Sequence, residues 1–324
     1  MKIFVTRRIS DRGIELLKSK GYEVVVSPHD RVLTRDELIG FFKKDRYDAV
    51  LCLLTDKIDS EVLDAAKVGG VRIFANMAVG FDNVDVKAAK ERGILVANTP
   101  GVLTDTVAEH TFALLLAIAR RIPESDRFTR AGKYTGWEPV LLLGTDVSKK
   151  VLGIVGLGRI GSRVASHAAK GFEMKVIYHD VKRSEEFERE FGASFRENVD
   201  DIFQEADFIS LHVPLLESTH HIVDARRLAL MKKTAYLINT SRGPVVDEAA
   251  LREALKNGTI RGAALDVYEN EPELTPGLAE LENVILTPHT ASATEEARQK
   301  MSELAAKNII EALEGRTPPN LIKP

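Results

Sequence analysis

The sequence has little cysteine, little net charge and no long hydrophobic run, and each absence excludes a class of protein. The single cysteine, Cys52, cannot form an intramolecular disulfide and fits a small buried side chain in a reducing compartment. A formal net charge of −3 over 324 residues gives no overall basic field for a nucleic acid. The most apolar stretch, residues 112–119, is too short to cross a bilayer, and the N-terminus lacks the apolar core of a secretory signal. We therefore expect a cytoplasmic protein that binds neither nucleic acid nor membrane.

The first hundred residues alternate between apolar runs and helical patterns. Thr34 and Glu37 form a capping box that predicts the start of one of these helices. Continuous apolar runs suit strands that are covered on both faces, as in a parallel sheet. The predicted strands are IFVT (3–6), EVVVS (23–27), AVLCLL (49–54) and RIFANM (72–77).

The middle of the chain begins with a long apolar helix, predicted over 106–121, that we expect to pack between domains or subunits. Residues 127–148 have no clear period and are interpreted as an extended arm. A second series of strands follows, and a last helix, Thr294–Leu313, is predicted to start with a capping box of Ser292 and Glu295. The strands of this series are VLGIV (151–155), KVIYH (175–179), FISLHV (208–213), AYLIN (235–239), AALDV (263–267) and VILT (284–287).

Two successive series of this kind predict an α/β protein with two doubly wound, Rossmann-like parallel sheets. The length of 324 residues suits two domains of ordinary size.

A glycine-rich loop follows the first strand of the second series. Gly156, Gly158 and Gly161 form G-x-G-x-x-G between an apolar strand and a helix, and the next strand ends in Asp180. The first glycine would allow the tight turn, the second the approach of a pyrophosphate, and the third close packing of helix on strand. The alternative to dinucleotide binding is an ordinary strand–helix turn, with Asp180 at its position by chance. Because Asp180 would repel a 2′-phosphate, we expect NAD(H) over NADP(H), although Lys182 and Arg183 leave NADP(H) possible.

Polar residues stand at several strand ends, where doubly wound sheets bind ligands. Arg242, Asp266 and His289 take such positions, and Glu271 follows in ENEP. Reduction of a 2-oxo acid needs a forked cation for the carboxylate and a proton donor for the carbonyl oxygen, and a carboxylate would favour a protonated histidine. A solvated loop explains Arg242 or Glu271 equally well at this stage, and His212 competes with His289 as donor. No metal site is predicted.

Several separated motifs resemble one family along essentially the whole chain. VGLGRIG, HVPL, LINTSRGPVVDEAAL, ALDVYENEP and ILTPHTASAT, in this order and spacing, are similar to the D-isomer-specific 2-hydroxyacid dehydrogenases. The resemblance implies that Arg242 binds the substrate carboxylate and polarises the carbonyl, that Glu271 supports the catalytic histidine, and that His289 is the acid/base. It therefore implies an NAD(P)-dependent reduction of a small 2-oxo acid to the 2-hydroxy acid.

The resemblance also implies a discontinuous architecture, with the active site in the cleft between two domains. Residues 1–99 plus 288–324 would form the substrate-binding domain, and residues 100–287 the NAD-binding domain. Val79 and Gly80 would bind the substrate carboxylate, and Leu54 would touch the far end of the substrate. The remaining positions that match cofactor contacts are Thr106, Arg159, Ile160, His212, Pro214, Thr240 and Asp266.

Within the family, the arm GWEPVLLLGTDV and the stretch ENVILTPHTASATEEAR look most like glyoxylate/hydroxypyruvate reductases. That likeness implies a homodimer in which Trp137 reaches toward the partner's substrate, or only anchors the interface. HTASA at 289–293 departs from the commoner HIGSA, which leaves the three catalytic positions in place but changes the surroundings of the nicotinamide. The alternatives are a D-3-phosphoglycerate dehydrogenase and, in another class, an NAD-sensing corepressor-like binding protein.

Overall fold

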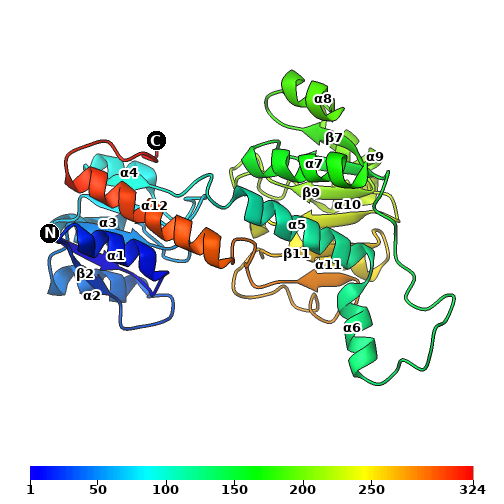
Figure 1. Ribbon diagram of the computed structural model, residues 1–324, viewed down its shortest axis with the longest axis horizontal. Helices are drawn as coiled ribbons and strands as arrows, with labels where there is room; N and C mark the ends of the chain where they lie inside the picture. Colours follow the sequence, from blue (N-terminus) through cyan, green and yellow to red (C-terminus); the bar gives the residue numbers. More distant parts are fainter. Residues whose placement is uncertain (324) are drawn as a thin grey trace. The chain divides into compact units, whose positions relative to one another are not determined.

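The computed structural model describes residues 1–323, and these form an α/β protein with two compact units. Of these residues, one unit contains 1–103 and 293–323, and the other contains 104–292 (Figure 1). The predicted α/β class with two parallel sheets is confirmed. Residues 288–292 were predicted to belong to the discontinuous domain. In this division they belong to the other unit, which ends at residue 292.

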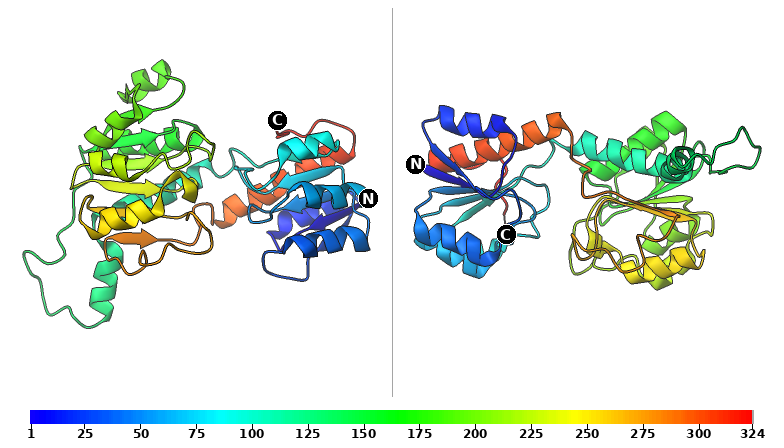
Figure 2. Two further views of the ribbon diagram at one scale, coloured as in Figure 1. Left: turned by 180° about the vertical axis from the view of Figure 1, so that it is seen from behind. Right: turned by 90° about the horizontal axis from the view of Figure 1, so that it is seen from below.

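The discontinuous unit is built on a five-stranded parallel sheet in the order β2-β1-β3-β4-β5. Helices α1 and α12 cover one face, and α2, α3 and α4 pack on the other (Figure 2, right). The strands are β1 (Lys2–Val5), β2 (Glu23–Val26), β3 (Ala49–Cys52), β4 (Ile73–Asn76) and β5 (Leu95–Ala97). The helices are α1 (Asp11–Ser19), α2 (Arg35–Lys44), α3 (Ser60–Val68), α4 (Val86–Glu91) and α12 (Glu295–Leu313).

Two helix starts test the predicted caps in this unit. The Thr34 side chain accepts the Glu37 N–H, and the Glu37 side chain accepts the Thr34 N–H, so the predicted capping box of α2 is confirmed. The box predicted for α12 is wrong, because Thr294, not Ser292, is the N-cap and its hydroxyl accepts the Ala297 N–H. The third residue of the helix is then an alanine, so α12 has a simple cap.

The second unit is built on a seven-stranded parallel sheet in the order β12-β11-β10-β9-β6-β7-β8. Its strands are β6 (Val151–Val155), β7 (Lys175–His179), β8 (Ser194–Phe195), β9 (Phe208–Leu211), β10 (Tyr236–Asn239), β11 (Gly262–Leu265) and β12 (Val284–Leu286). Its helices are α5 (Thr104–Ala119), α6 (Ile122–Arg130), α7 (Arg159–Phe172), α8 (Glu185–Phe191), α9 (Val199–Glu205), α10 (Ala225–Leu230) and α11 (Glu248–Lys256), with a 3-10 turn at Gly243–Val245.

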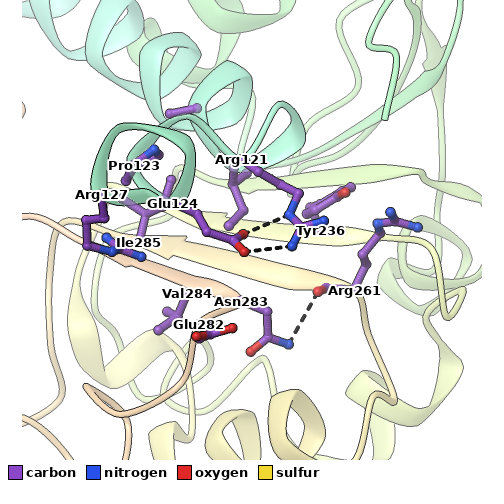
Figure 3. Close-up of a pocket in the computed structure, with 12 residues that line it drawn as sticks. Arg121, Pro123, Glu124, Arg127, Tyr236, Arg261, Glu282, Asn283, Val284 and Ile285 are labelled. Atoms are coloured by element: carbon purple, nitrogen blue, oxygen red, sulfur yellow. Dashed lines mark hydrogen bonds and ion pairs between the residues drawn. The ribbon is translucent and has the colours of Figure 1, made fainter. Parts of the chain in front are cut away.

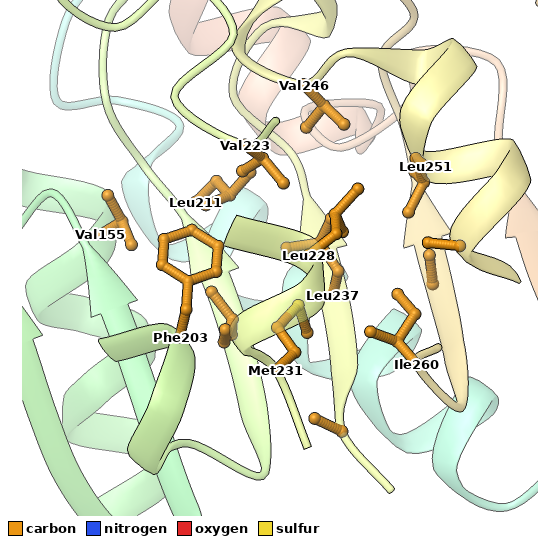
Figure 4. Packing of buried hydrophobic residues seen from close by; sticks show 14 of the residues in the cluster. Val155, Phe203, Leu211, Val223, Leu228, Met231, Leu237, Val246, Leu251 and Ile260 are labelled. Carbon is orange, nitrogen blue, oxygen red and sulfur yellow. The ribbon is translucent and has the colours of Figure 1, made fainter. Parts of the chain in front are cut away.

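A hydrophobic core covers each face of this sheet. Helices α5 and α7 pack on one face, and α9, α10 and α11 pack on the other. Figure 4 shows the second core, in which Phe203 of α9 and Leu228 of α10 lie against Leu237 of β10. The strands between these layers are almost fully buried, which accounts for their continuous apolar sequences.

Helix α5 packs on the sheet of its own unit, and its place between domains or subunits stays a prediction. Half of its 16 residues are buried, and six of these eight belong to the core on one face of the sheet. Arg121, with φ 53°, separates α5 from α6. The predicted arm, residues 127–148, therefore begins inside a helix, and irregular structure starts only after Arg130. Helix α6 buries none of its side chains.

Within residues 1–323, no helix has the length and apolar character needed to cross a membrane. The same residues contain no group of three His, Cys, Asp or Glu side chains arranged to hold a metal ion.

Candidate active site

Six of the predicted site residues of the second unit lie at one edge of its sheet. Each of the six follows the carboxyl end of a parallel strand, and doubly wound sheets bind ligands at this edge. From β12 toward β7, the sheet order places at this edge His289, Asp266, Arg242, His212, Gly156 and Asp180. The proton-transfer candidates and the glycine loop thus occupy opposite halves of the edge.

The glycine loop has the geometry that a pyrophosphate needs. Gly156 has φ 94°, and a Cβ there would lie 2.8 Å from the carbonyl group of His212. A Cβ on Gly161 would overlap the carbonyl oxygen of Gly156, so only glycine lets α7 pack this closely. Gly158 caps α7, and a Cβ there would meet no atom within 4 Å. An anion therefore has room beside the N–H groups that begin this helix.

Asp180 lies directly beside this loop. Its Oδ2 accepts the backbone N–H of Leu157 at 2.6 Å, and its Oδ1 accepts the N–H of Lys182 at 3.2 Å. The carboxylate is partly exposed, so it retains lone pairs for ribose hydroxyls. The hydrogen bond from Leu157 fixes the Asp180 carboxylate next to the glycine loop. The loop and the acid therefore fit the pyrophosphate and the ribose of an adenosine dinucleotide.

The other predicted cofactor contacts differ in their exposure. Arg159 and Pro214 are exposed, whereas Ile160 and Thr106, in the first turns of their helices, are partly buried. Thr240 is 8% exposed, and its hydroxyl lies 2.8 Å from that of Thr111 on α5. Side-chain contact with a cofactor is therefore easiest for the exposed and partly exposed positions.

His212 does not suit the role of proton donor. Its Nε2 lies 2.8 Å from the hydroxyl of the buried Ser210, and burial of the ring lowers the pKa of His212 to about 3. The imidazole is therefore neutral at physiological pH. The low pKa of His212 favours His289 as the candidate proton donor, in agreement with the resemblance.

Arg242 is positioned by the backbone around it. Strand β10 ends at Asn239, whose side-chain amide donates to the carbonyl oxygen of Arg242 at 2.9 Å. A Cβ on Gly243 would overlap the carbonyl of Tyr268, so the chain after Arg242 lies against the segment that leads to Glu271. The guanidinium donates to the carbonyl oxygen of Ser241 at 2.8 Å and is partly exposed. The close approach of Tyr268 thus explains why a glycine follows the arginine.

His289 and Glu271 form a hydrogen-bonded pair. The Nδ1 of His289 lies 2.9 Å from Oε2 of Glu271, and the two side chains are 25% and 30% exposed. The other carboxylate oxygen of Glu271 accepts the N–H of Tyr268 at 3.0 Å. Because Glu271 holds Nδ1, the Nε2 atom of His289 remains for a substrate.

The turn that carries His289 rests on Asp266, which is fully buried. Its carboxylate accepts the hydroxyl of Thr287 at 2.6 Å and the N–H groups of Thr290 and Ala291, each at 2.8 Å. Burial alone would raise the pKa of Asp266, but hydrogen bonds from His110, Thr287 and the two N–H groups hold it below its ordinary value. Asp266 was predicted to line the cofactor, whereas its carboxylate is engaged by this turn.

Tyr268 is a residue whose role the sequence did not reveal. Its N–H holds Glu271, and its hydroxyl donates to the carbonyl oxygen of Thr287 at 2.8 Å. It therefore ties the segment of Glu271 to the segment of His289. No residue pattern in DVYENEP signals this double contact.

In the other unit, the predicted substrate contacts lie on two neighbouring loops. Leu54 follows β3, and Val79 and Gly80 follow β4. Within residues 1–323, the N–H groups of Val79 and Gly80 donate to no protein acceptor, and both residues are partly exposed. Two adjacent N–H groups of this kind suit a carboxylate.

Trp137 lies in the irregular segment after α6, and its side chain is 83% exposed. Packing within residues 1–323 therefore covers little of this ring.

A cavity of about 230 Å³ lies elsewhere in the same unit (Figure 3). Its lining includes Arg121 and Glu124 of the α5–α6 region, Tyr236 at the start of β10 and Val284 at the start of β12. These positions are at the amino ends of the strands, so the cavity is at the edge opposite the candidate site.

Comparison with known proteins agrees with this geometry. The family model for the NAD-binding domain of D-isomer-specific 2-hydroxyacid dehydrogenases matches residues 112–291. A glyoxylate reductase of Thermococcus kodakarensis is 49% identical, over 99% of this chain and 96% of the relative.

Solved structures are similar over the full length. A crystal structure of a Thermus thermophilus protein has a TM-score of 0.92 at 42% identity, with 100% of both chains covered. An NADPH-dependent glyoxylate/hydroxypyruvate reductase of Sinorhizobium meliloti, solved with NADP and malonate, has a TM-score of 0.85 at 33% identity, over 99% of this chain and 96% of that one.

Proposed function

We propose that this chain, which belongs to the D-isomer-specific 2-hydroxyacid dehydrogenases, reduces glyoxylate and hydroxypyruvate with NADH. Membership of this family makes it an NAD(P)-dependent dehydrogenase of 2-oxo acids. The observation that carries the proposal is the His289–Glu271 pair at the same sheet edge as the glycine loop and Asp180. A proton source and a dinucleotide fit are what this reduction requires.

The chemistry divides between the cofactor and the chain. The nicotinamide, when bound, supplies a hydride to the carbonyl carbon. His289 gives the proton on Nε2 to the carbonyl oxygen, and Glu271 stabilises the imidazolium before the transfer. Arg242 supplies a planar, permanently charged fork for the substrate carboxylate, and its charge also stabilises the oxygen as negative charge develops there.

Val79 and Gly80 complete the recognition of the substrate. Their N–H groups would donate to the carboxylate, and Leu54 on the neighbouring loop would limit the far end of the acid. An apolar limit of this kind favours small 2-oxo acids, which supports glyoxylate and hydroxypyruvate as substrates.

NADH is the preferred cofactor in this proposal. Asp180 would bind the ribose diol and repel a 2′-phosphate. Arg183 offers little compensation for a phosphate, because its guanidinium forms two hydrogen bonds with Glu188, at 2.9 and 2.8 Å. The Sinorhizobium relative uses NADPH, so this preference is a property that distinguishes members of the family.

We also infer a homodimer, in which α6 and the segment after it contact the second subunit. Helix α6 buries no side chain, and the apolar residues Ile122, Tyr134, Trp137, Val140 and Leu143 are all more than half exposed. Burial of such residues against a second copy would supply the missing hydrophobic contact. We place this dimer in the cytoplasm, where the single buried thiol of Cys52 stays reduced.

Steady-state assays of a substrate panel test the proposal. Glyoxylate, hydroxypyruvate, 3-phosphohydroxypyruvate and longer 2-oxo acids are each assayed with NADH and with NADPH. We expect the first two substrates to have the highest kcat/KM, and NADH to exceed NADPH by at least tenfold. Equal kcat/KM with NADH and with NADPH would contradict the proposal that Asp180 binds the ribose diol and repels a 2′-phosphate. A preference for the phosphorylated acid would instead favour a phosphoglycerate dehydrogenase.

A further inference from the structure

A pair of asparagines connects the two loops that carry the proposed substrate contacts. One loop follows β3 and contains Leu54, and the other follows β4 and contains Val79 and Gly80. Asn83 lies just beyond the second loop and is partly exposed, whereas Asn76, the last residue of β4, is fully buried.

The Asn83 side chain binds the first loop with its amide group. Its Nδ2 donates to the carbonyl oxygens of Leu53 and Asp56, both at 3.0 Å. These two acceptors lie on either side of Leu54, so both hydrogens of one amide fix the turn that presents it.

The other end of the same amide binds the second loop through Asn76. The Oδ1 of Asn83 accepts from Nδ2 of Asn76 at 3.0 Å, and that Nδ2 also donates to the carbonyl oxygen of Gly80 at 3.0 Å. A continuous set of hydrogen bonds therefore runs from the backbone around Leu54 to the backbone of Gly80.

Other contacts hold each part without Asn83. The Asp56 carboxylate accepts the N–H of Leu53 at 2.7 Å and the hydroxyl of Thr6 at 2.5 Å. The backbone of Asn83 is also held, because its carbonyl oxygen accepts the N–H of Ile58 at 2.9 Å. Loss of the Asn83 side chain would thus remove the side-chain link between the turn of Leu54 and the loop of Gly80. The backbone bonds of Ile58 with Asn83 and with Asp85 would keep the fold in place.

We propose that Asn83 is a positioning residue that fixes the spacing between the carboxylate-binding loop and the loop of Leu54, and thereby sets the length of 2-oxo acid that the enzyme prefers. This inference rests on the proposed function of the same site. It does not involve the cofactor, because the connected residues are all in the unit of residues 1–103 and 293–323.

The test compares Asn83→Ala with the wild-type enzyme on glyoxylate and on 2-oxopentanoate. Loss of the two donated hydrogen bonds lets the loops separate, so the short acid should lose its fit more than the long one. We expect the ratio of kcat/KM for glyoxylate to that for 2-oxopentanoate to fall about tenfold, mainly through a higher KM for glyoxylate. NADH affinity, followed by fluorescence, should be unchanged.

Asn283→Ala is a matched control. Its amide also donates to two carbonyl oxygens, those of Leu255 at 3.1 Å and Arg261 at 3.3 Å, but at the amino edge of the other unit. It should leave the substrate ratio at the wild-type value. Asn83→Asp is a second test variant, since it keeps the shape but replaces the donors by a carboxylate. It should reproduce the shift.

The outcomes separate the two proposals. A wild-type enzyme that reduces no 2-oxo acid contradicts the proposed function and, with it, this inference. A folded, active Asn83→Ala enzyme with the wild-type ratio overturns the inference alone. The same holds if both Asn83 variants fail to fold, because the residue would then be structural.

Discussion

At the scale of single residues, the candidate site depends on groups whose backbone is fixed by neighbours. Arg242 is held by Asn239 and by the close approach of Gly243 to Tyr268. His289 has φ 53°, and its N–H donates to the carbonyl oxygen of Asp266 at 2.9 Å. Such constraints orient a side chain before any substrate arrives, which is the preorganisation that catalysis requires.

Arg242→Lys tests the clamp proposed for the substrate carboxylate. Lysine keeps the charge but loses the planar pair of donors, so the variant should fold normally and lose catalytic efficiency. We expect kcat/KM for glyoxylate to fall about a hundredfold or more, since a bidentate charged contact contributes a few kcal/mol. Circular dichroism checks the fold. A variant within threefold of the wild type would make Arg242 an ordinary loop residue.

The sequence predicted which residues lie at the sheet edge, but it did not predict which groups form hydrogen bonds with them. The glycine loop could be predicted, because each glycine has a backbone task that no other residue performs. The residue pattern alone did not separate His212 from His289, and the resemblance of the motifs favoured His289. The structure adds the burial that lowers the pKa of His212 and the carboxylate beside His289. Asp266 shows the same limit, because a strand-end acid in the sequence does not reveal which way its oxygens are engaged.

At the scale of secondary structure, α9 and α10 are joined by one carboxylate. Asp200 of α9 accepts from Arg226 at 2.6 Å and from Arg227 at 2.8 Å, both on α10. These hydrogen bonds lower the pKa of Asp200 from 3.8 to about 2, against an opposing effect of burial. The ionised group therefore stabilises the folded state above its unfolded pKa, and this contribution disappears as pH falls from about 4 toward 2.

Asp200→Asn should lower the free energy of unfolding at pH 7. We expect a loss of about 1 kcal/mol, because the exposure of Arg226 screens part of the interaction. Denaturant titration at pH 7 and pH 3 measures it, and the difference from wild type should shrink at pH 3. The control is Asp126→Asn, whose partner Arg130 and own side chain are more than half exposed. An equal loss at both pH values would contradict an ionic origin.

Continuous apolar strands could be predicted from the sequence, whereas two of the shortest strands could not. VLGIV and KVIYH coincide with β6 and β7, because buried parallel strands need continuous apolar residues. Strands β5 and β8 were missed, since three and two residues carry too little pattern. The cap of α12 was misplaced by two residues because Ser292 and Thr294 are both suitable caps, and only the backbone decides between them.

At the scale of the whole molecule, two units divide the proposed work. Residues 104–292 contain the glycine loop, Arg242, Glu271 and His289, and the other unit contains Leu54, Val79 and Gly80. The alternation of strands and helices predicted two parallel sheets, since this alternation is what the fold class requires. The discontinuous connection came from the resemblance of the motifs, because no local pattern tells a last helix to return to the first sheet.

The most direct test of the account is the pH dependence of glyoxylate reduction by wild type, Glu271→Gln and His289→Ala. Reduction needs a protonated His289, and removal of the Glu271 charge destabilises the imidazolium. The basic limb of the kcat/KM profile should therefore move to lower pH in Glu271→Gln. His289→Ala should reduce the rate about 10²–10⁴-fold at every pH, with NADH binding retained in both variants. A Glu271→Gln profile that coincides with the wild-type profile would contradict the pairing on which the proposed mechanism depends.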